Sequence, residues 1–170
     1  AILLTTNAGL WAYSIGDTVK FVSKNPYRIV VTGRIKHFIS AFGEHVIGEE
    51  VEKAMNAALL AFPEVKVTEF TVAPQVNPLD GGLPYHEWLI EFDQVPEKLN
   101  AFQEVLDQSM QSQNIYYKDL LEGKILQSLV VTQVAKGGFI EMMKKQGKLG
   151  GQNKVPRLSN DRNLAELLIV

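Results

Sequence analysis

Three short clusters in the sequence place polar side chains beside glycines, where the backbone can turn tightly. The first runs from Tyr13 to Asp17 and has Gly16 directly before the aspartate. Glycine permits backbone conformations that other residues resist, and a carboxylate at such a turn can accept hydrogen bonds from a ribose diol. An aspartate after glycine is also an ordinary turn residue. Asp17 is therefore a candidate nucleotide ligand, with a plain turn as the alternative.

The second cluster, residues 33–46, combines two glycines with charged side chains. Arg34 follows the first glycine, and its guanidinium could bind phosphate or ribose oxygens. Glu44 and His45 follow the second glycine, just before a pattern that is typical of a helix. A connector that leads into a capped helix explains the same residues. Taken alone, these residues favour the connector over a binding site.

The third cluster, residues 148–162, surrounds a pair of glycines and is basic. Lys154 follows the glycines and precedes Pro156, so a mobile loop could deliver its ammonium to a phosphate or a carboxylate. The cluster is not a phosphate-binding loop of the GxxxxGK[ST] type, because neither the spacing nor the residue after the lysine fits. A solvated basic tail is the alternative, and the glycine and proline content favours a specific loop.

Hydrophobic spacing predicts the elements that must hold these clusters. Apolar residues recur every three or four positions from Ile47 to Phe62, which predicts a helix that Pro63 ends. Further helices are predicted from Pro96, at 114–123 and from 137 to 143. Strand patterns occupy the ranges 18–22, 27–32, 65–73, 87–92 and 125–134.

The order of these elements predicts an α+β fold: a small mixed or antiparallel sheet with helices packed on one face, preceded by a short β subdomain. The apolar spacing changes its period after Gly33–Arg34. We therefore place a domain boundary there, which divides the chain into residues 1–34 and 35–170.

The composition restricts the class of protein. The chain has 170 residues, of which 46% are hydrophobic, which is sufficient for one ordinary core. A net charge of −2 gives no basic field that would attract nucleic acid or an anionic membrane. The absence of cysteine excludes disulfides and thiolate zinc sites and suits a reducing cytoplasm. We expect a soluble, cytoplasmic protein without a bound metal, since His37, His45 and His86 lack the spacing of metal ligands.

Taken in order, the three clusters resemble the last third of adenylate-forming enzymes. The resemblance is greatest to the auxin-responsive acyl-acid amido synthetase family, including its bacterial members. The Tyr-x-x-Gly-Asp segment implies that Asp17 binds the ribose of ATP, with Tyr13 beside it. It also implies that Arg34 approaches the ribose or phosphate and that Lys36 is the hinge residue before a C-terminal domain.

The resemblance continues after the hinge and covers nearly the whole chain. The segment FISAFGEHVIGEEV is similar to a family segment whose tip, here Glu44 and His45, is implied to face the active site. Lys154 resembles the lysine that reaches the adenylate in the closed state. Residues 1–34 would then be the β-rich tail of a large adenylation domain, and residues 35–170 the C-terminal lid. The family's phosphate loop and acyl pocket are absent, so we interpret the chain as a C-terminal piece of a longer enzyme.

The implied activity is that of an ATP-dependent, AMP-forming ligase. A carboxylic acid is adenylated, and the acyl group then passes to an amine or amino acid. ATP and Mg²⁺ would be bound mainly by the absent domain, and we expect the piece to be inactive alone. The alternative from another class is a non-catalytic α+β module that binds a partner protein through the loop from Pro74 to Pro84. DNA binding is disfavoured by the acidic pI, and the substrates and oligomeric state stay open.

Overall fold

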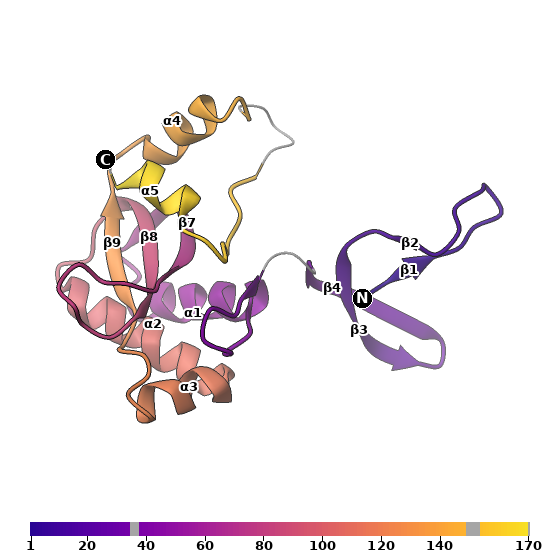
Figure 1. Ribbon diagram of the computed structural model, residues 1–170, viewed down its shortest axis with the longest axis horizontal. Coiled ribbons are helices and arrows are strands. Elements are labelled where there is room, and N and C mark those ends of the chain that lie inside the picture. The colour runs from indigo at the N-terminus through magenta and orange to yellow at the C-terminus, as the bar shows by residue number, and fades with distance from the viewer. Residues whose placement is uncertain (35–37, 149–153, 170) are drawn as a thin grey trace.

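The computed structural model describes residues 1–34, 38–148 and 154–169. Its first part consists of two antiparallel strand pairs (Figure 1). β1 (Leu3–Leu4) pairs with β2 (Tyr13–Ser14), and β3 (Asp17–Lys24) pairs with β4 (Tyr27–Arg34). Both longer strands were predicted from their alternation and their β-branched residues. Apolar side chains of this hairpin, including those of Phe21, Tyr27 and Val31, are exposed.

A three-stranded sheet forms the centre of the second part. β7 (Lys66–Gln75) is antiparallel to β8 (Tyr85–Gln94), and β8 is parallel to β9 (Val130–Val134). A parallel neighbour needs a long crossover connection, which α2 (Leu99–Gln113) and α3 (Ile115–Glu122) supply. The sheet is therefore mixed. The last predicted strand begins only at Val130, five residues later than expected.

The helix α1 (Gly48–Ala61) follows a short strand pair, β5 (Phe38–Ile39) with β6 (Val46–Ile47). The Glu50 carboxylate accepts the backbone N–H of Ile47 at 2.9 Å and so satisfies one of the free donors at the helix start. Val51, Ala54 and Ala58 are buried on one face, as the spacing predicted.

Helices cover both faces of the sheet. Trp88 and Ile90 of β8 pack in the core beneath α1, α2 and α3. Between them, Leu89 points to the opposite face, where α4 (Gly138–Lys145) and α5 (Asn163–Leu168) cover it. The predicted α+β class, with a small sheet and packed helices, is confirmed. The second helical layer comes in addition to the predicted one.

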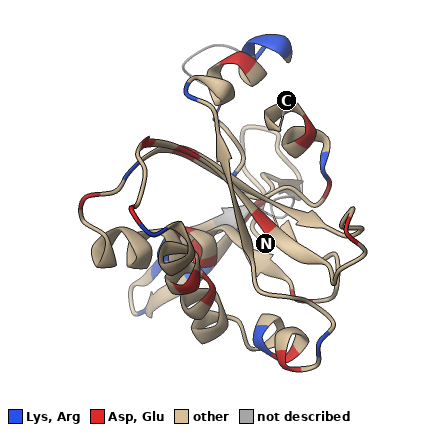
Figure 2. Ribbon diagram, turned by 90° about the vertical axis from the view of Figure 1, so that its left-hand side faces the viewer, with Lys and Arg blue, Asp and Glu red and all other residues tan. Residues whose placement is uncertain are grey.

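The segment after residue 154 runs beside β7 as a short additional edge (Figure 1). Val72 donates its backbone N–H to the carbonyl of Arg157 at 3.0 Å and accepts from Ser159 at 2.9 Å. The hydroxyl of Thr71 donates to the carbonyl of Pro156 at 2.7 Å. These bonds fix the position at which the chain carries Lys154. Figure 2 shows positive and negative positions interspersed over the helices and loops.

Candidate functional site

Pairing of β3 with β4 brings together the first two predicted site residues. Asp17 and Arg34 stand opposite each other in register at the open end of the hairpin. Gly16, directly before Asp17, has a φ of 80°, a left-handed conformation that favours glycine. The predicted tight turn is therefore present. Tyr13 lies exposed in β2, whereas Lys36 falls outside the described residues.

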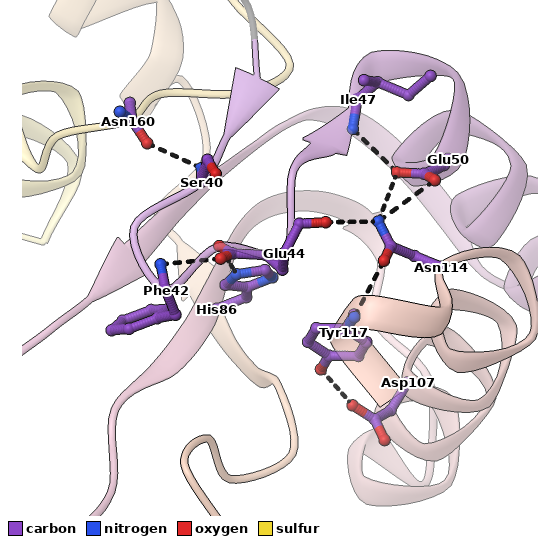
Figure 3. Close-up of polar contacts among 10 residues, drawn as sticks. All are labelled: Ser40, Phe42, Glu44, Ile47, Glu50, His86, Asp107, Asn114, Tyr117 and Asn160. Atoms are coloured by element: carbon purple, nitrogen blue, oxygen red, sulfur yellow. Dashed lines mark hydrogen bonds and ion pairs between the residues drawn. The ribbon is translucent and has the colours of Figure 1, made fainter. Parts of the chain in front are cut away.

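Glu44 is buried in a polar cluster that joins several elements (Figure 3). Its Oε1 lies 2.9 Å from Nε2 of His86 in β8, and its Oε2 accepts the backbone N–H of Phe42 at 2.8 Å. The His86 ring is 1% exposed and stacks on the ring of Tyr117, with centroids 5.1 Å apart. The carboxylate of Glu44 therefore points into the protein.

The surroundings of Glu44 determine which atoms carry protons. Burial by itself would raise the pKa of its carboxyl, but the hydrogen bonds from His86 and from backbone N–H groups outweigh burial and lower that pKa. Glu44 is therefore ionised at neutral pH and acts only as an acceptor. It follows that Nε2 of His86 carries a hydrogen atom and donates a hydrogen bond to Glu44.

Asn114 links this pair to two helices. Its Nδ2 donates to the backbone carbonyl of Glu44 at 3.0 Å and lies 3.3 Å from the Glu50 carboxylate. Its Oδ1 accepts the backbone N–H of Tyr117 at 2.9 Å, which caps α3. One side chain at the junction of α2 and α3 thus holds the loop before α1 in place.

A second buried carboxylate, that of Asp107, completes the cluster. Its Oδ1 accepts the hydroxyl of Tyr117 at 2.6 Å and the backbone N–H of Leu129 at 3.1 Å. Burial, followed by the negative charge of Asp107, raises the pKa of Tyr117 far above its ordinary value. The phenol therefore stays protonated and donates. These hydrogen bonds hold the segment 38–47 against the sheet.

His45, unlike Glu44, is exposed. It has a φ of 49°, and its ring lies over that of Phe38, with centroids 4.8 Å apart. Nearby, Asn160 accepts the backbone N–H of Ser40 at 3.0 Å and so connects this segment to the C-terminal one. His45 is available to a ligand, whereas Glu44 is occupied. Nucleotide binding by either residue stays a prediction.

The predicted catalytic lysine, Lys154, lines a hollow of about 670 Å³, which we call the Lys154 hollow. The α4 residues Phe139, Ile140 and Met143 form its apolar wall, together with Val155. Its polar lining consists of Lys148, Lys154, Arg157, Thr68, Glu52, Glu69 and Glu91. A concave site with an apolar wall and a few converging polar groups is the usual form of a small-molecule pocket.

Arg157 bonds to two of the carboxylates around this hollow. Its Nε lies 2.5 Å from Glu52, and its Nη1 contacts both Glu69 and, at 3.0 Å, the carbonyl of Phe70. The guanidinium also stands 4.4 Å over the Phe70 ring. Partial burial opposes the charge of Arg157, but the hydrogen bonds that it donates to Glu69 and Glu52 outweigh burial and raise the pKa of the guanidinium.

The third carboxylate, Glu91, binds the start of α4. It is 5% exposed and accepts the backbone N–H groups of Gly137 at 2.8 Å and Phe139 at 3.3 Å. A carboxylate at this position also interacts favourably with the positive end of the helix dipole. By contrast, Lys148 and Lys154 have no ion pair within the described ranges.

The Glu44 cluster and the Lys154 hollow are separate. They contact β8 at His86 and Glu91, five residues apart, or about 16 Å at about 3.3 Å per residue. The structure thus brings Asp17 together with Arg34, and Lys154 together with Arg157, but it leaves Glu44 away from Lys154. Asp17, Glu44 and Lys154 therefore lie at three separate places in the fold.

Sequence patterns did not single out His86, Asp107, Glu91 or Arg157 as partners in these clusters. One signal was present: Glu91 stands between the apolar residues Ile90 and Phe92 of a predicted strand, and buried carboxylates are almost always paired. The identity of each partner depends on residues far away in the sequence. In the described part of the chain, no group of three or more His, Asp or Glu side chains lies close enough to hold a metal ion. Nor do the described ranges contain a helix with the length and apolar content that crossing a bilayer requires.

Comparison with known proteins identifies the family. The model of the GH3 family C-terminal domain matches residues 49–163, and that of the GH3 family central domain matches residues 1–34. Because the first match alone spans more than half of the chain, the chain belongs to the GH3 family. No curated protein matches the sequence.

Solved structures support the same fold. One titled "GH3.15 acyl acid amido synthetase" matches with a TM-score of 0.77 at 22% identity, over 98% of this chain and 31% of that one. Another, "AtGH3.15 acyl acid amido synthetase in complex with 2,4-DB", matches with a TM-score of 0.74 at 21% identity and the same coverage. The chain thus spans about a third of the length of these proteins.

Proposed function

We propose that the chain is the C-terminal part of an ATP-dependent acyl-acid amido synthetase. The single observation that carries this proposal is the match of the GH3 C-terminal domain over residues 49–163. The similarity in fold to two chains that are titled acyl acid amido synthetases supports it. In the proposed reaction, a carboxylate attacks the α-phosphate of ATP and releases pyrophosphate. An amine then attacks the acyl carbon, and AMP leaves.

Lys154 is the proposed catalytic residue of this chain. Negative charge develops on phosphate and carbonyl oxygens in both steps, and a nearby ammonium stabilises it. Lys154 is exposed at the mouth of a hollow and is unpaired among the described residues. Such a group is suited to act when a lid domain closes over the substrates.

Asp17 and Arg34 are the proposed contacts to the nucleotide, with Tyr13 beside them. A carboxylate can accept from the ribose hydroxyls, and a guanidinium can donate to ribose or phosphate oxygens. The register of β3 with β4, together with the turn at Gly16, supports this pairing of roles. His45 is a further proposed contact, and Lys36 the proposed hinge. Mg²⁺ is assigned to the part of the enzyme outside this chain.

The exposed apolar side chains of β3 and β4 support a further element of the proposal. A hairpin that leaves Phe21, Tyr27 and Val31 open to solvent has no core of its own. We propose that residues 1–34, which match the GH3 family central domain, pack on a large adenylation domain. The chain alone would then lack most of the active site and would be inactive.

The test is ATP-dependent release of pyrophosphate across a panel of carboxylic acids, with the full-length enzyme and this chain assayed side by side. We expect release by the full-length enzyme and none by the chain. Lys154→Ala should lower the rate of adenylation about 100-fold, the usual scale for a charge-stabilising residue. Lys145→Ala, an exposed lysine outside the hollow, is the matched control.

A different outcome would favour the second candidate, a protein-interaction module. The observation in its favour is the loop between β7 and β8, where Leu79 is completely exposed and Val76 and Leu83 are nearly half exposed. Exposed apolar residues grouped in a loop are typical of contact surfaces. If the full-length enzyme released no pyrophosphate with any of the acids, this result would contradict the synthetase proposal and favour the interaction module.

A further inference from the structure

The Lys154 hollow has one wall suited to a hydrocarbon and another suited to an anion. Phe139, Ile140 and Met143 on α4, together with Val155, present an apolar surface. Ile140 is 57% exposed, so a ligand in the hollow would cover apolar surface that is otherwise in contact with water. Burial of such a surface by a ligand is favourable.

The carboxylates around the hollow have hydrogen-bond donors, whereas two of its cations have no acidic partner among the described residues. Each of the three carboxylates already has a donor: Arg157 serves Glu52 and Glu69, and the N-terminus of α4 serves Glu91. The two lysines, Lys148 and Lys154, have no acidic partner among the described residues. The formal charges of these six side chains cancel, but among the described residues the two lysines are the charged groups of the hollow without a bonded partner, so they are the groups left to contact an anion.

The geometry points to a binding site in this chain for a small carboxylate with an apolar body. The hydrocarbon part contacts Ile140, Met143 and Val155, and the carboxylate lies between Lys148 and Lys154. The volume of about 670 Å³ is within the usual range of small-molecule pockets. This site goes beyond the proposed adenylation step, because it belongs to the C-terminal domain alone and requires no ATP.

The test is an NMR titration of the isotope-labelled chain, without ATP, in which backbone amide signals are followed as ligand is added. Hexanoate is the probe, hexanamide is its uncharged analogue, and hexylammonium has the opposite charge. We expect hexanoate to shift the amides of Ile140, Met143 and Val155 in a saturable manner. Hexanamide should bind about 10-fold more weakly, because it lacks the negative charge that the two lysines attract.

Three variants separate the two walls. Lys154→Met and Lys148→Met should each weaken hexanoate binding about 3-fold, the scale of a partly exposed ion pair. Ile140→Ser should weaken hexanoate binding without changing the response to acetate, which lacks the hydrocarbon part. Lys145→Met, on the same helix but outside the hollow, should leave binding unchanged. These exposed positions leave the core intact, and the unliganded spectrum reports whether each variant is folded.

Three results would overturn the inference: no saturable shift with hexanoate, equal binding of hexanamide, or tighter binding of hexylammonium. The last would show that the carboxylates, rather than the lysines, select the ligand. Unchanged affinity in the Lys148→Met, Lys154→Met double variant would also contradict it. Because the titration contains no ATP, its outcome is independent of the pyrophosphate assay, and either proposal can fail without the other.

Discussion

Nε2 of His86 lies 2.9 Å from Oε1 of Glu44, and both side chains are almost completely buried. The two residues are 42 positions apart in the sequence. Their contact fastens the segment before α1 to the central strand of the sheet, next to the boundary between the two predicted domains. In the proposed lid, this contact would lie shortly after the proposed hinge.

Glu44→Gln should destabilise the chain by about 2 kcal/mol near neutral pH, because a neutral amide cannot accept from both His86 and Phe42. Hydrogen bonding in the folded state lowers the pKa of Glu44 below its ordinary value of 4.5. The contribution of Glu44 to the free energy of unfolding is therefore complete above pH 4.5. It is lost as the pH falls through the folded-state pKa. Urea unfolding at about pH 7 and about pH 4 should therefore show a smaller difference at the lower pH.

Glu49→Gln is the matched control for this experiment. Glu49 is in the same region but is exposed and pairs with Lys53, four residues later, at 2.6 Å. Surface pairs contribute little to stability, so this variant should behave nearly as the wild type. An equal loss for Glu44→Gln at both pH values would show that shape, and not charge, is what Glu44 supplies.

Tyr117→Phe should lower the free energy of unfolding by about 1 to 2 kcal/mol, because it removes the donor to Asp107 while the buried carboxylate stays. Chemical denaturation measures this directly. Tyr116→Phe is the control, since Tyr116 is exposed. If only the packing of the Tyr117 ring mattered, and not its hydroxyl, Tyr117→Phe would be as stable as the wild type.

Glu91→Ala should loosen the start of α4 before it unfolds the rest. It removes the acceptor for the N–H groups of Gly137 and Phe139, a loss of about 1 kcal/mol for a helix cap. Hydrogen exchange at these two amides should accelerate by at least about 5-fold, while the amides of β7 keep their protection. Glu141→Ala, in the exposed first turn of α4, is the comparison. Uniform acceleration throughout the sheet would argue against a local cap.

Arg157→Lys should also be destabilising, by about 1 kcal/mol, although it preserves the charge. An ammonium cannot bridge Glu52 and Glu69 and also lie flat over the Phe70 ring, as the guanidinium does. Thermal unfolding of this variant should be compared with that of Arg28→Lys, an exposed position in β4. Equal melting temperatures for both variants would mean that Arg157 acts only as a point charge.

Local patterns correctly located most elements. The three- and four-residue spacing from Ile47 to Phe62 gave α1 to within one residue at each end, because one buried stripe and Pro63 define it. The second helix begins at Leu99, three residues after Pro96, where it was predicted to open. The short helix α5 was missed, since six residues are too few for a clear apolar period.

The sequence by itself determined the α+β class, the hairpin with its glycine turn before Asp17, and the resemblance that led to the GH3 family. These features depend on residues that are near one another along the chain. Only the tertiary structure decided the partners of the buried charges. From the sequence, Glu44 was predicted to lie at a tip that faces the active site. In the structure it is buried, because its partner His86 comes from a strand that lies 42 residues away in the sequence. The same reason applies to Lys154: its hollow is formed by α1, β7, β8 and α4, which approach one another only when the sheet forms.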